Sequence, residues 1–337
     1  MIDLDELDTS LLRLIDEGER NVAIRAAASS RVSRQTAAAR LRKLSDAGLI
    51  EATGTGRGRQ YALRDVRSEM REFPLEELSE DAVWRSFASL VNGFPENVRA
   101  LWHYGVTEMV NNAIDHSGGR MLRVGLRFNA VRGQGFIQDD GEGIFDRLQR
   151  LLKLVDPKEA IVELAKGKLT TDPARHTGEG IFFTSRAFDR FTILSRALQF
   201  IHDVGRNEWL IGERGDQVGT VVLLELENNS ARVLRNVFDQ FAQPDEFVFD
   251  RTVVPVRLAQ HDGERLVSRS QAKRLVARFE RFNAVVLDFN GVDEIGQAFA
   301  DEIFRVFQAA HPEVMVTSLN ASPEVGRMIR RATATAR

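Results

Sequence analysis

Apolar residues in the first 65 positions recur three or four residues apart, the spacing that places them on one face of a helix. Three segments show this spacing: 11–15, 22–28 and 33–47. Ser33 is suited to cap the third helix, and Gly48 is suited to end it. Two short runs follow at 49–52 and 60–63, and the glycine-rich stretch between them predicts a hairpin. We therefore expect a first domain, residues 1–65, of three helices and two strands.

Helix and strand patterns alternate through the rest of the chain. Residues 66–82 are polar and contain Pro74, which predicts a linker. The segment 83–230 mixes both patterns and is expected to form a second domain. Residues 247–337 show strand and helix patterns in alternation, which predicts a small α/β layer. The expected fold class is multidomain α/β.

Composition narrows the class of protein without identifying a function. Apolar residues make up 43% and charged residues 28% of the chain, a balance typical of globular domains. The absence of cysteine excludes disulfide and zinc–thiolate chemistry and favours a reducing, cytoplasmic setting. The acidic N-terminus is unlike a signal peptide. No apolar run approaches the roughly 18 residues of a membrane helix, so we expect no membrane contact.

Charge is distributed unevenly along the chain. The formal net charge is −3, yet residues 21–64 hold nine Arg and Lys against two Asp and Glu, a local net charge of +7. Such a local excess predicts an anion-binding face rather than a generally basic protein.

Three polar residues in the segment 102–117 share one face of a predicted helix. Glu108, Asn112 and Asp115 are spaced i, i+4 and i+7. Carboxylate and amide oxygens one turn apart suit Mg²⁺, which prefers oxygen ligands and is commonly shared with substrate phosphates. A solvated polar stripe would show the same spacing, so this helix alone leaves both interpretations open.

A first glycine motif, Asp139-x-Gly141-x-Gly143, follows a predicted strand over 136–139. The two glycines allow the backbone to approach a flat ligand closely. An aspartate at the strand end can accept a hydrogen bond from an exocyclic amine, as on adenine. Taken alone, such a run is more often a simple turn.

A second glycine motif, Gly178-x-Gly180, opens a predicted helix. Amide N–H groups at the start of a helix bind phosphate readily. The preceding segment, 146–175, contains Lys168 and suggests a mobile lid over a triphosphate. Further along, Thr220 follows a glycine and opens another predicted strand.

The order and spacing of these four elements resemble the GHKL ATPase superfamily, which includes gyrase and the sensor histidine kinases. The motifs that carry the resemblance are an N box, Glu108-x-x-x-Asn112, a G1 box, Asp139-x-Gly141-x-Gly143, and a G2 box, Gly178-x-Gly180. The resemblance implies a Bergerat α/β sandwich, with helices packed on one face of a mixed sheet.

The same resemblance implies ATP and Mg²⁺ as ligands and assigns roles to residues. Asn112 would ligate Mg²⁺, and Glu108 would contact it directly or through a water. Glu108 would also be the general base in members that hydrolyse ATP. Asp139 would bond the adenine amino group. The other expected nucleotide contacts are Asp115, Gly141, Gly143, Ile144, Lys168, Thr177, Gly178, Gly180 and Thr220.

The basic first domain resembles a winged helix-turn-helix. Its third helix would enter the major groove of DNA, and the hairpin would reach phosphate or the minor groove. The expected DNA contacts are Arg34, Gln35, Arg40, Arg42, Lys43, Arg57 and Arg59. A winged helix used for dimerisation or protein contact is the alternative. The local positive charge favours DNA, bound through residues 21–64.

The last domain resembles a STAS-like domain of unknown function that is found beside such ATPase domains. It is also distantly similar to STAS anti-anti-sigma domains, which carry a phosphorylated serine after a strand. Here that strand ends at Asp288, and the aligned position is Gln297 or Ala298, neither of which has a hydroxyl. This weakens the case for a phosphorylation switch within the chain, and the domain is expected to serve a protein partner.

These features together predict an ATP- and Mg²⁺-binding transcriptional regulator, expected to be a homodimer, with weak ATPase activity. The alternative is an anti-sigma-type serine/threonine kinase that acts on a partner protein. A nucleotide-binding module without turnover is a third hypothesis. Glu108 and Asn112 do not separate these alternatives, because all three use the same pocket.

Overall fold

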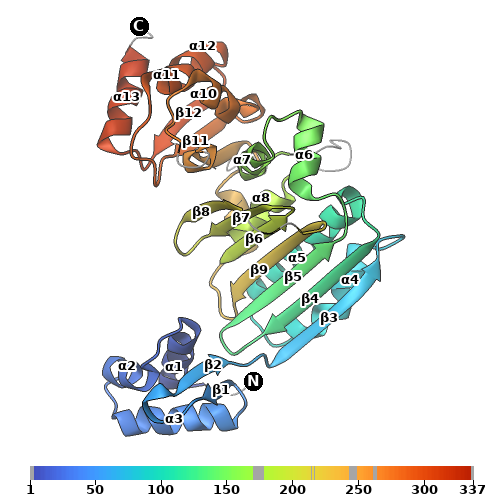
Figure 1. The fold of residues 1–337 in the computed structure, drawn as a ribbon, viewed down its shortest axis with the longest axis vertical. Coiled ribbons are helices and arrows are strands. Elements are labelled where there is room, and N and C mark those ends of the chain that lie inside the picture. Colours follow the sequence, from blue (N-terminus) through green and yellow to red (C-terminus); the bar gives the residue numbers. More distant parts are fainter. Residues whose placement is uncertain are drawn as a thin grey trace.

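The computed structural model describes residues 4–169, 178–213, 215, 217–242, 249–260 and 264–334. Within these residues the chain forms three separate β-sheets, of two, seven and three strands, each accompanied by helices (Figure 1). The predicted mixed α/β fold class is therefore confirmed. The two-stranded and three-stranded sheets lie at opposite ends of the central seven-stranded sheet (Figure 1).

The N-terminal block has the elements that its hydrophobic spacing predicts. They are α1 Glu6–Asp16, α2 Val22–Ser29, α3 Arg34–Asp46, and an antiparallel hairpin of β1 Ile50–Thr53 and β2 Gln60–Leu63. Ser33 caps α3, because its hydroxyl oxygen accepts a hydrogen bond from the Thr36 N–H at 3.0 Å. The block has its own hydrophobic cluster, built on Leu11, Leu12, Ile15, Val22, Ala26, Leu41, Leu44, Leu49 and Ile50.

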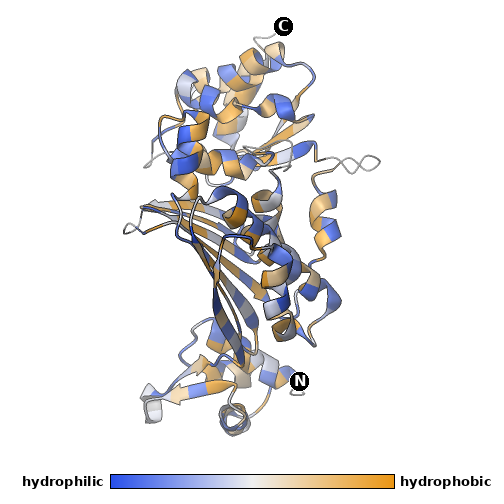
Figure 2. Cartoon of the chain, turned by 90° about the vertical axis from the view of Figure 1, so that its right-hand side faces the viewer, coloured by the Kyte–Doolittle hydropathy of each residue, from blue (hydrophilic) through white to orange (hydrophobic). Residues whose placement is uncertain are grey.

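The central sheet has the strand order β3-β4-β5-β9-β6-β7-β8, and neighbouring strands are antiparallel. Its strands are β3 Arg67–Pro74, β4 Met121–Phe128, β5 Arg132–Asp139, β6 Arg190–Ser195, β7 Leu198–Asp203, β8 Glu208–Glu213 and β9 Thr220–Glu227. Buried and accessible residues alternate along β4 and β5, as expected for a sheet with one covered face. Figure 2 shows hydrophobic and hydrophilic residues interspersed along the strands of the central sheet. The associated helices are α4 Glu80–Phe87, α5 Glu96–His116, α8 Gly180–Ala187 and α9 Leu234–Asp239.

The predicted linker, residues 66–82, is wrong. Residues 67–74 form β3, which pairs with β4 along its whole length, from Arg67 opposite Phe128 to Pro74 opposite Met121. The strand is polar because it lies at the edge of the sheet and most of its side chains remain accessible to water. Pro74 is tolerated because it is the last residue of an edge strand.

The C-terminal block combines a three-stranded parallel sheet with helices. Its strands are β10 Arg251–Pro255, β11 Ala284–Asp288 and β12 Met315–Leu319, in that spatial order. Its helices are α10 Arg269–Val276, α11 Gln297–Asp301, α12 Gln308–Ala310 and α13 Pro323–Ala334, with a π-helical segment, Glu302–Phe307, between α11 and α12. The sequence predicts a longer helix over 270–282. Instead α10 ends at Val276, and Arg278 takes a left-handed backbone with φ 65°.

Helix α6, Ile144–Leu152, packs against helix α7, Lys158–Lys166, and α7 packs against β10 of the C-terminal block (Figure 1). A single hydrophobic core runs through both units, from Val83 in α4 to Ala332 in α13. The central and C-terminal blocks are therefore packed together, whereas the N-terminal block keeps a separate core. No helix in the described parts of the chain is long and apolar enough to span a bilayer.

Candidate functional site

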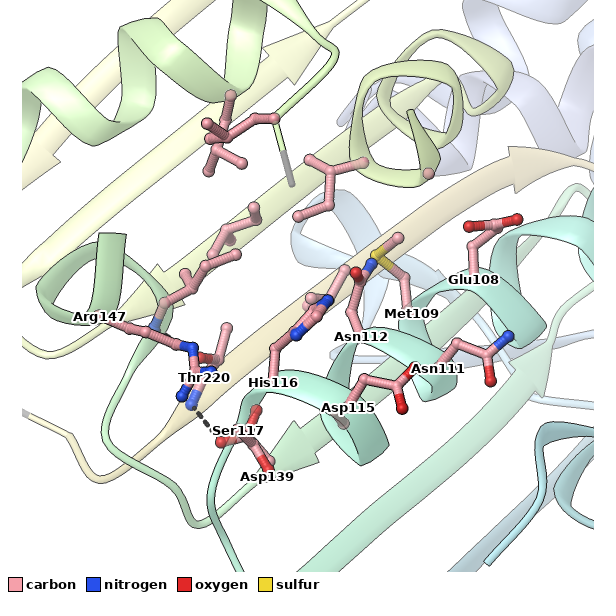
Figure 3. Close-up of a pocket in the computed structure, with 18 of the residues that line it drawn as sticks. Glu108, Met109, Asn111, Asn112, Asp115, His116, Ser117, Asp139, Arg147 and Thr220 are labelled. Carbon is pink, nitrogen blue, oxygen red and sulfur yellow. Dashed lines mark hydrogen bonds between the residues drawn. The ribbon is translucent and has the colours of Figure 1, made fainter. Parts of the chain in front are cut away.

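A cavity of about 300 Å³ opens between α5, the β5–α6 junction, the start of α8 and the start of β9 (Figure 3). Nine of the predicted nucleotide-site residues line it: Glu108, Asn112, Asp115, Asp139, Gly143, Ile144, Gly178, Gly180 and Thr220. They come from segments more than 100 residues apart in the sequence. The fold therefore gathers the separate motifs around one space of a size usual for a small-molecule site.

Helix α5 contributes the acidic and amide side of the cavity. Glu108, Asn112 and Asp115 follow one another along the helix and line the cavity, as the i, i+4, i+7 spacing predicts (Figure 3). The opposite face of α5 is buried in the core, where Val106 and Val110 are fully inaccessible to water. Amphipathic packing of this kind holds the polar face at the cavity wall.

Asp139, the last residue of β5, forms the opposite end of the cavity and is 7% exposed. Its Oδ1 accepts hydrogen bonds from the Gly141 N–H at 2.9 Å and the Thr220 N–H at 3.2 Å. Burial raises the pKa of this carboxyl, and the two backbone hydrogen bonds partly offset that effect. A desolvated carboxylate held in one orientation is suited to accept a hydrogen bond from a ligand amine.

Glycines around Asp139 allow backbone segments to approach each other closely. A Cβ on Gly141 would collide with the Ser117 carbonyl, and a Cβ on Gly219 would collide with the Asp139 carbonyl. Gly143 has φ +93°, a conformation that L side chains rarely adopt. Gly141 itself does not line the cavity. The structure places it behind Asp139, where its N–H orients the carboxylate.

The second glycine motif forms the start of α8. Gly178 has φ +72°, and its carbonyl accepts a hydrogen bond from the Leu169 N–H at 3.1 Å. A Cβ on Gly180 would collide with Oε2 of Glu108, so this glycine allows the Glu108 carboxylate to lie against the first turn of α8. An acidic side chain of α5 and the N-terminus of a helix therefore meet at one end of the cavity.

Asn112 places an unpaired, buried polar atom at the cavity wall. Its Nδ2 is buried and has no hydrogen-bond partner among the described residues. Amide nitrogen and oxygen are interchangeable by a flip of the side chain, so the same position can hold the oxygen that Mg²⁺ requires. The chemistry of Asn112 and Glu108 therefore fits a magnesium ion shared with phosphates. No cluster of three or more His, Cys, Asp or Glu side chains that could hold a metal occurs among the described residues.

Arg147 is a cavity residue that the motifs do not reveal. It lies on α6 one turn after Ile144 and lines the cavity (Figure 3). Its guanidinium donates a hydrogen bond to the Glu142 carboxylate at 2.8 Å. Arg150 donates to the same carboxylate at 2.9 Å. Burial alone would raise the pKa of Glu142, but these hydrogen bonds hold it below its usual value. The sequence signal that could have identified Arg147 is its position three residues after Ile144, which places both residues on one face of a helix.

Lys168 was predicted to contact the nucleotide, but in the structure it does not line the cavity. Its Nζ donates to the Arg281 carbonyl at 3.0 Å and lies over the rings of Phe249 and Phe282 in the C-terminal block. Thr177, another predicted contact, lies outside the described residues.

Most of the predicted DNA-contacting side chains are exposed. They are Arg34, Gln35, Arg42 and Lys43 on α3, and Arg59 at the hairpin. Arg40 differs, because it forms ion pairs with Asp5 and with Asp8, at 2.9 Å from the latter. Arg40 thus joins α3 to α1, and we remove it from the expected DNA-contacting set. The side chain of Arg57 lies outside the described part of the chain.

Comparison with known families identifies the C-terminal block alone. Residues 271–325 match a STAS-like domain of unknown function (DUF4325). The match runs from α10 into α13, which confirms the STAS-like character predicted for this block. No curated protein matches the chain significantly.

Proposed function

We propose that this chain is an ATP- and Mg²⁺-binding transcriptional regulator, in which a GHKL-type nucleotide site controls an N-terminal winged-helix DNA-binding unit. The observation that carries the proposal is the convergence of nine motif residues from four separate segments on one cavity. Each motif alone has a plainer explanation. A polar helix stripe and two simple turns would have no reason to share one cavity.

In this proposal the two ends of the cavity recognise different parts of ATP. Asp139 accepts a hydrogen bond from the adenine amino group, and Thr220 lies beside it, with its hydroxyl already accepting from the Ile144 N–H at 3.0 Å. The N-terminus of α8, at Gly178 and Gly180, receives the phosphates. Asn112 and Glu108 would hold Mg²⁺, which when bound neutralises charge on the phosphate oxygens.

Glu108 is the residue proposed for turnover. Its carboxylate lies against Gly180, at the helix terminus proposed to bind the phosphates. From this position it could orient a water and accept its proton as the water attacks the terminal phosphate. We expect this activity to be weak, as in a regulator rather than a metabolic enzyme.

A radiolabel experiment separates ATPase, kinase and non-hydrolysing alternatives. Purified protein is incubated with γ-labelled ATP and Mg²⁺, with and without DNA. We expect slow release of labelled phosphate, reduced at least about a hundredfold in Glu108→Ala, a loss usual for a general base. Glu96→Ala is the matched control, because Glu96 is exposed at the start of the same helix and does not line the cavity. Label retained on protein would instead support the kinase, and binding without release would support a sensor.

The DNA-binding part of the proposal rests on the exposed basic side of α3. Arg42 and Lys43 are both exposed on this helix, next to the buried Leu41 and Leu44 that fix its orientation. If both contact phosphate, replacing them with alanine should lower the slope of log affinity against log salt by about 1.8, at about 0.9 for each contact. Arg327→Ala, at an exposed side chain of α13, is the control. An unchanged slope would contradict binding through α3.

A further inference from the structure

Two cationic residues at the junction between α7 and the C-terminal block have a left-handed backbone. Lys168, just after α7, has φ 53°, and Arg278, just after α10, has φ 65°. Glycine or asparagine adopts this conformation at lower cost than Lys or Arg. A long cationic side chain at such a position suggests that the side chain itself is used.

Arg278 reaches α7 through a buried cluster of charges. Its guanidinium donates to Glu163 of α7 at 2.7 Å. The other oxygen of Glu163 accepts from Lys166 at 2.6 Å, and the Lys166 side chain is 1% exposed. Lys166 also donates to the Ala277 carbonyl at 2.9 Å. Buried ion pairs with satisfied hydrogen bonds hold one relative position of the two elements.

Lys168 makes the reciprocal connection from the α7 side. It donates to the Arg281 carbonyl, and the Arg281 guanidinium donates to the Lys168 carbonyl, both at 3.0 Å. The preceding Gly167 packs so tightly that a Cβ would collide with Phe249 and Phe182. Residues 166–168 are therefore packed between α8 and the C-terminal block.

The same short segment forms part of the nucleotide cavity. Leu164 of α7 and Leu169 line the cavity, and the Leu169 N–H bonds to the Gly178 carbonyl at the start of the second glycine motif. One side of residues 164–169 therefore faces the proposed ligand, and the other is bonded to the C-terminal block. A displacement of that block would move the cavity wall.

We infer that Lys168 and Arg278 are positioning residues. They hold α7 against the STAS-like domain and thereby keep the wall that residues 164–169 contribute to the proposed nucleotide site in place. This inference rests on the proposed function, because it concerns the affinity of that same cavity. It assigns the STAS-like domain a role that does not require a phosphorylated serine. By reciprocity, nucleotide in the cavity must also favour the docked C-terminal domain.

The test uses the full chain with Lys168→Gly and Arg278→Gly. Glycine suits both backbones, and Glu163 keeps Lys166 as a partner, so the variants remove interdomain bonds without straining the turns. Glu77→Gly is the matched control, since Glu77 has φ 56° but lies in the β3–α4 connection. Amide hydrogen exchange of α7 is measured first, without nucleotide. We expect exchange at least about tenfold faster in both variants and unchanged in the control.

ATP affinity is then measured on the same proteins. Both variants should bind at least about fivefold more weakly than wild type, within the usual range of coupling between sites, while Glu77→Gly binds normally. Unchanged α7 exchange, or wild-type ATP affinity in both variants, would overturn the inference. If the wild type itself does not bind ATP, the proposed function fails, and the exchange measurement still decides whether the clamp exists.

Discussion

At the scale of single residues, Asp139 is an ionisable side chain at a position where burial disfavours its charged form. It is a carboxylate at the end of a core strand, and burial raises its pKa. Asparagine could accept the same two backbone hydrogen bonds without the charge. The negative charge and the second acceptor position of Asp139 are the features that the proposed ATP site would use.

The first prediction concerns the stability of Asp139→Asn. Because folding raises the pKa of Asp139, the folded protein binds this proton more tightly than the unfolded chain does. The stabilising effect of protonation is present at low pH and is lost as pH rises through the folded-state pKa. Thermal unfolding should therefore show Asp139→Asn as stable as wild type or more stable at pH 7, with the difference shrinking as pH falls. A clearly lower melting temperature at pH 7 would contradict this reading.

The second prediction separates two arginines of α3. Arg40→Ala should lower the free energy of unfolding by about 1–3 kcal/mol, because it leaves buried Asp8 without its ion-pair partner. Arg42→Ala, at an exposed position, should change it by about 0.5 kcal/mol or less. Denaturant unfolding of the N-terminal block measures both. Equal effects of the two substitutions would show that Arg40 is not structural.

At the scale of elements, the strongly patterned segments were predictable and the context-dependent ones were not. The helices and hairpin of the N-terminal block follow from apolar spacing and the Ser33 cap. The edge strand β3 was missed, because a strand paired on one side and largely exposed has the polar composition of a linker. The early end of α10 was also missed, since Arg278 carries no glycine-like signal for its left-handed turn.

In the candidate site, too, residues with a local sequence pattern were predictable and residues placed by long-range packing were not. The glycine motifs marked places of close approach, where Gly141 and Gly178 lie against backbone and Gly180 lies against the Glu108 side chain. Lys168 was assigned to the nucleotide from its position in the chain alone. Its true partners, Arg281 and two phenylalanine rings, lie more than 80 residues away in sequence and are brought close only by the packing of the C-terminal block.

The third prediction tests β3 as part of the sheet. A chain beginning at residue 66 should fold, whereas one beginning at residue 83 should aggregate or unfold, because it exposes the edge of β4 and loses the core contact of Phe73. Circular dichroism and size-exclusion chromatography compare the two. If the shorter chain folded as well as the longer one, β3 would be dispensable and the linker interpretation would regain support.

At the scale of the whole molecule, one strand connects the candidate site to the N-terminal block. Asp139 ends β5, and Arg132 begins it, a span of about 23 Å for an eight-residue strand. Arg132 pairs with Asp16 of α1 and with Glu225 of β9, the latter at 3.3 Å. Val131 also packs against the N-terminal hydrophobic cluster. The cavity and the N-terminal block therefore contact opposite ends of the same strand.

The fourth prediction follows from this contact. If ATP favours one arrangement of the N-terminal block, ATP with Mg²⁺ should change DNA affinity at least about fivefold in the wild type. Asp16→Asn, which weakens the contact to Arg132, should bring this ratio towards one. Glu19→Gln is the control, because Glu19 pairs with Arg25 inside the N-terminal block. Fluorescence anisotropy with and without ATP measures the ratio, and an unchanged ratio in Asp16→Asn would exclude this route.

ATP binding at the cavity is the central claim, and calorimetric titration of ATP with Mg²⁺ into wild type and Asp139→Asn tests it most directly. We expect saturable binding to the wild type. Loss of a hydrogen bond to a charged acceptor is worth about 1.5–3 kcal/mol, so Asp139→Asn should bind roughly 10- to 150-fold more weakly while remaining folded. No binding to the wild type, or equal affinity of the two proteins, would contradict the assignment of this cavity to ATP.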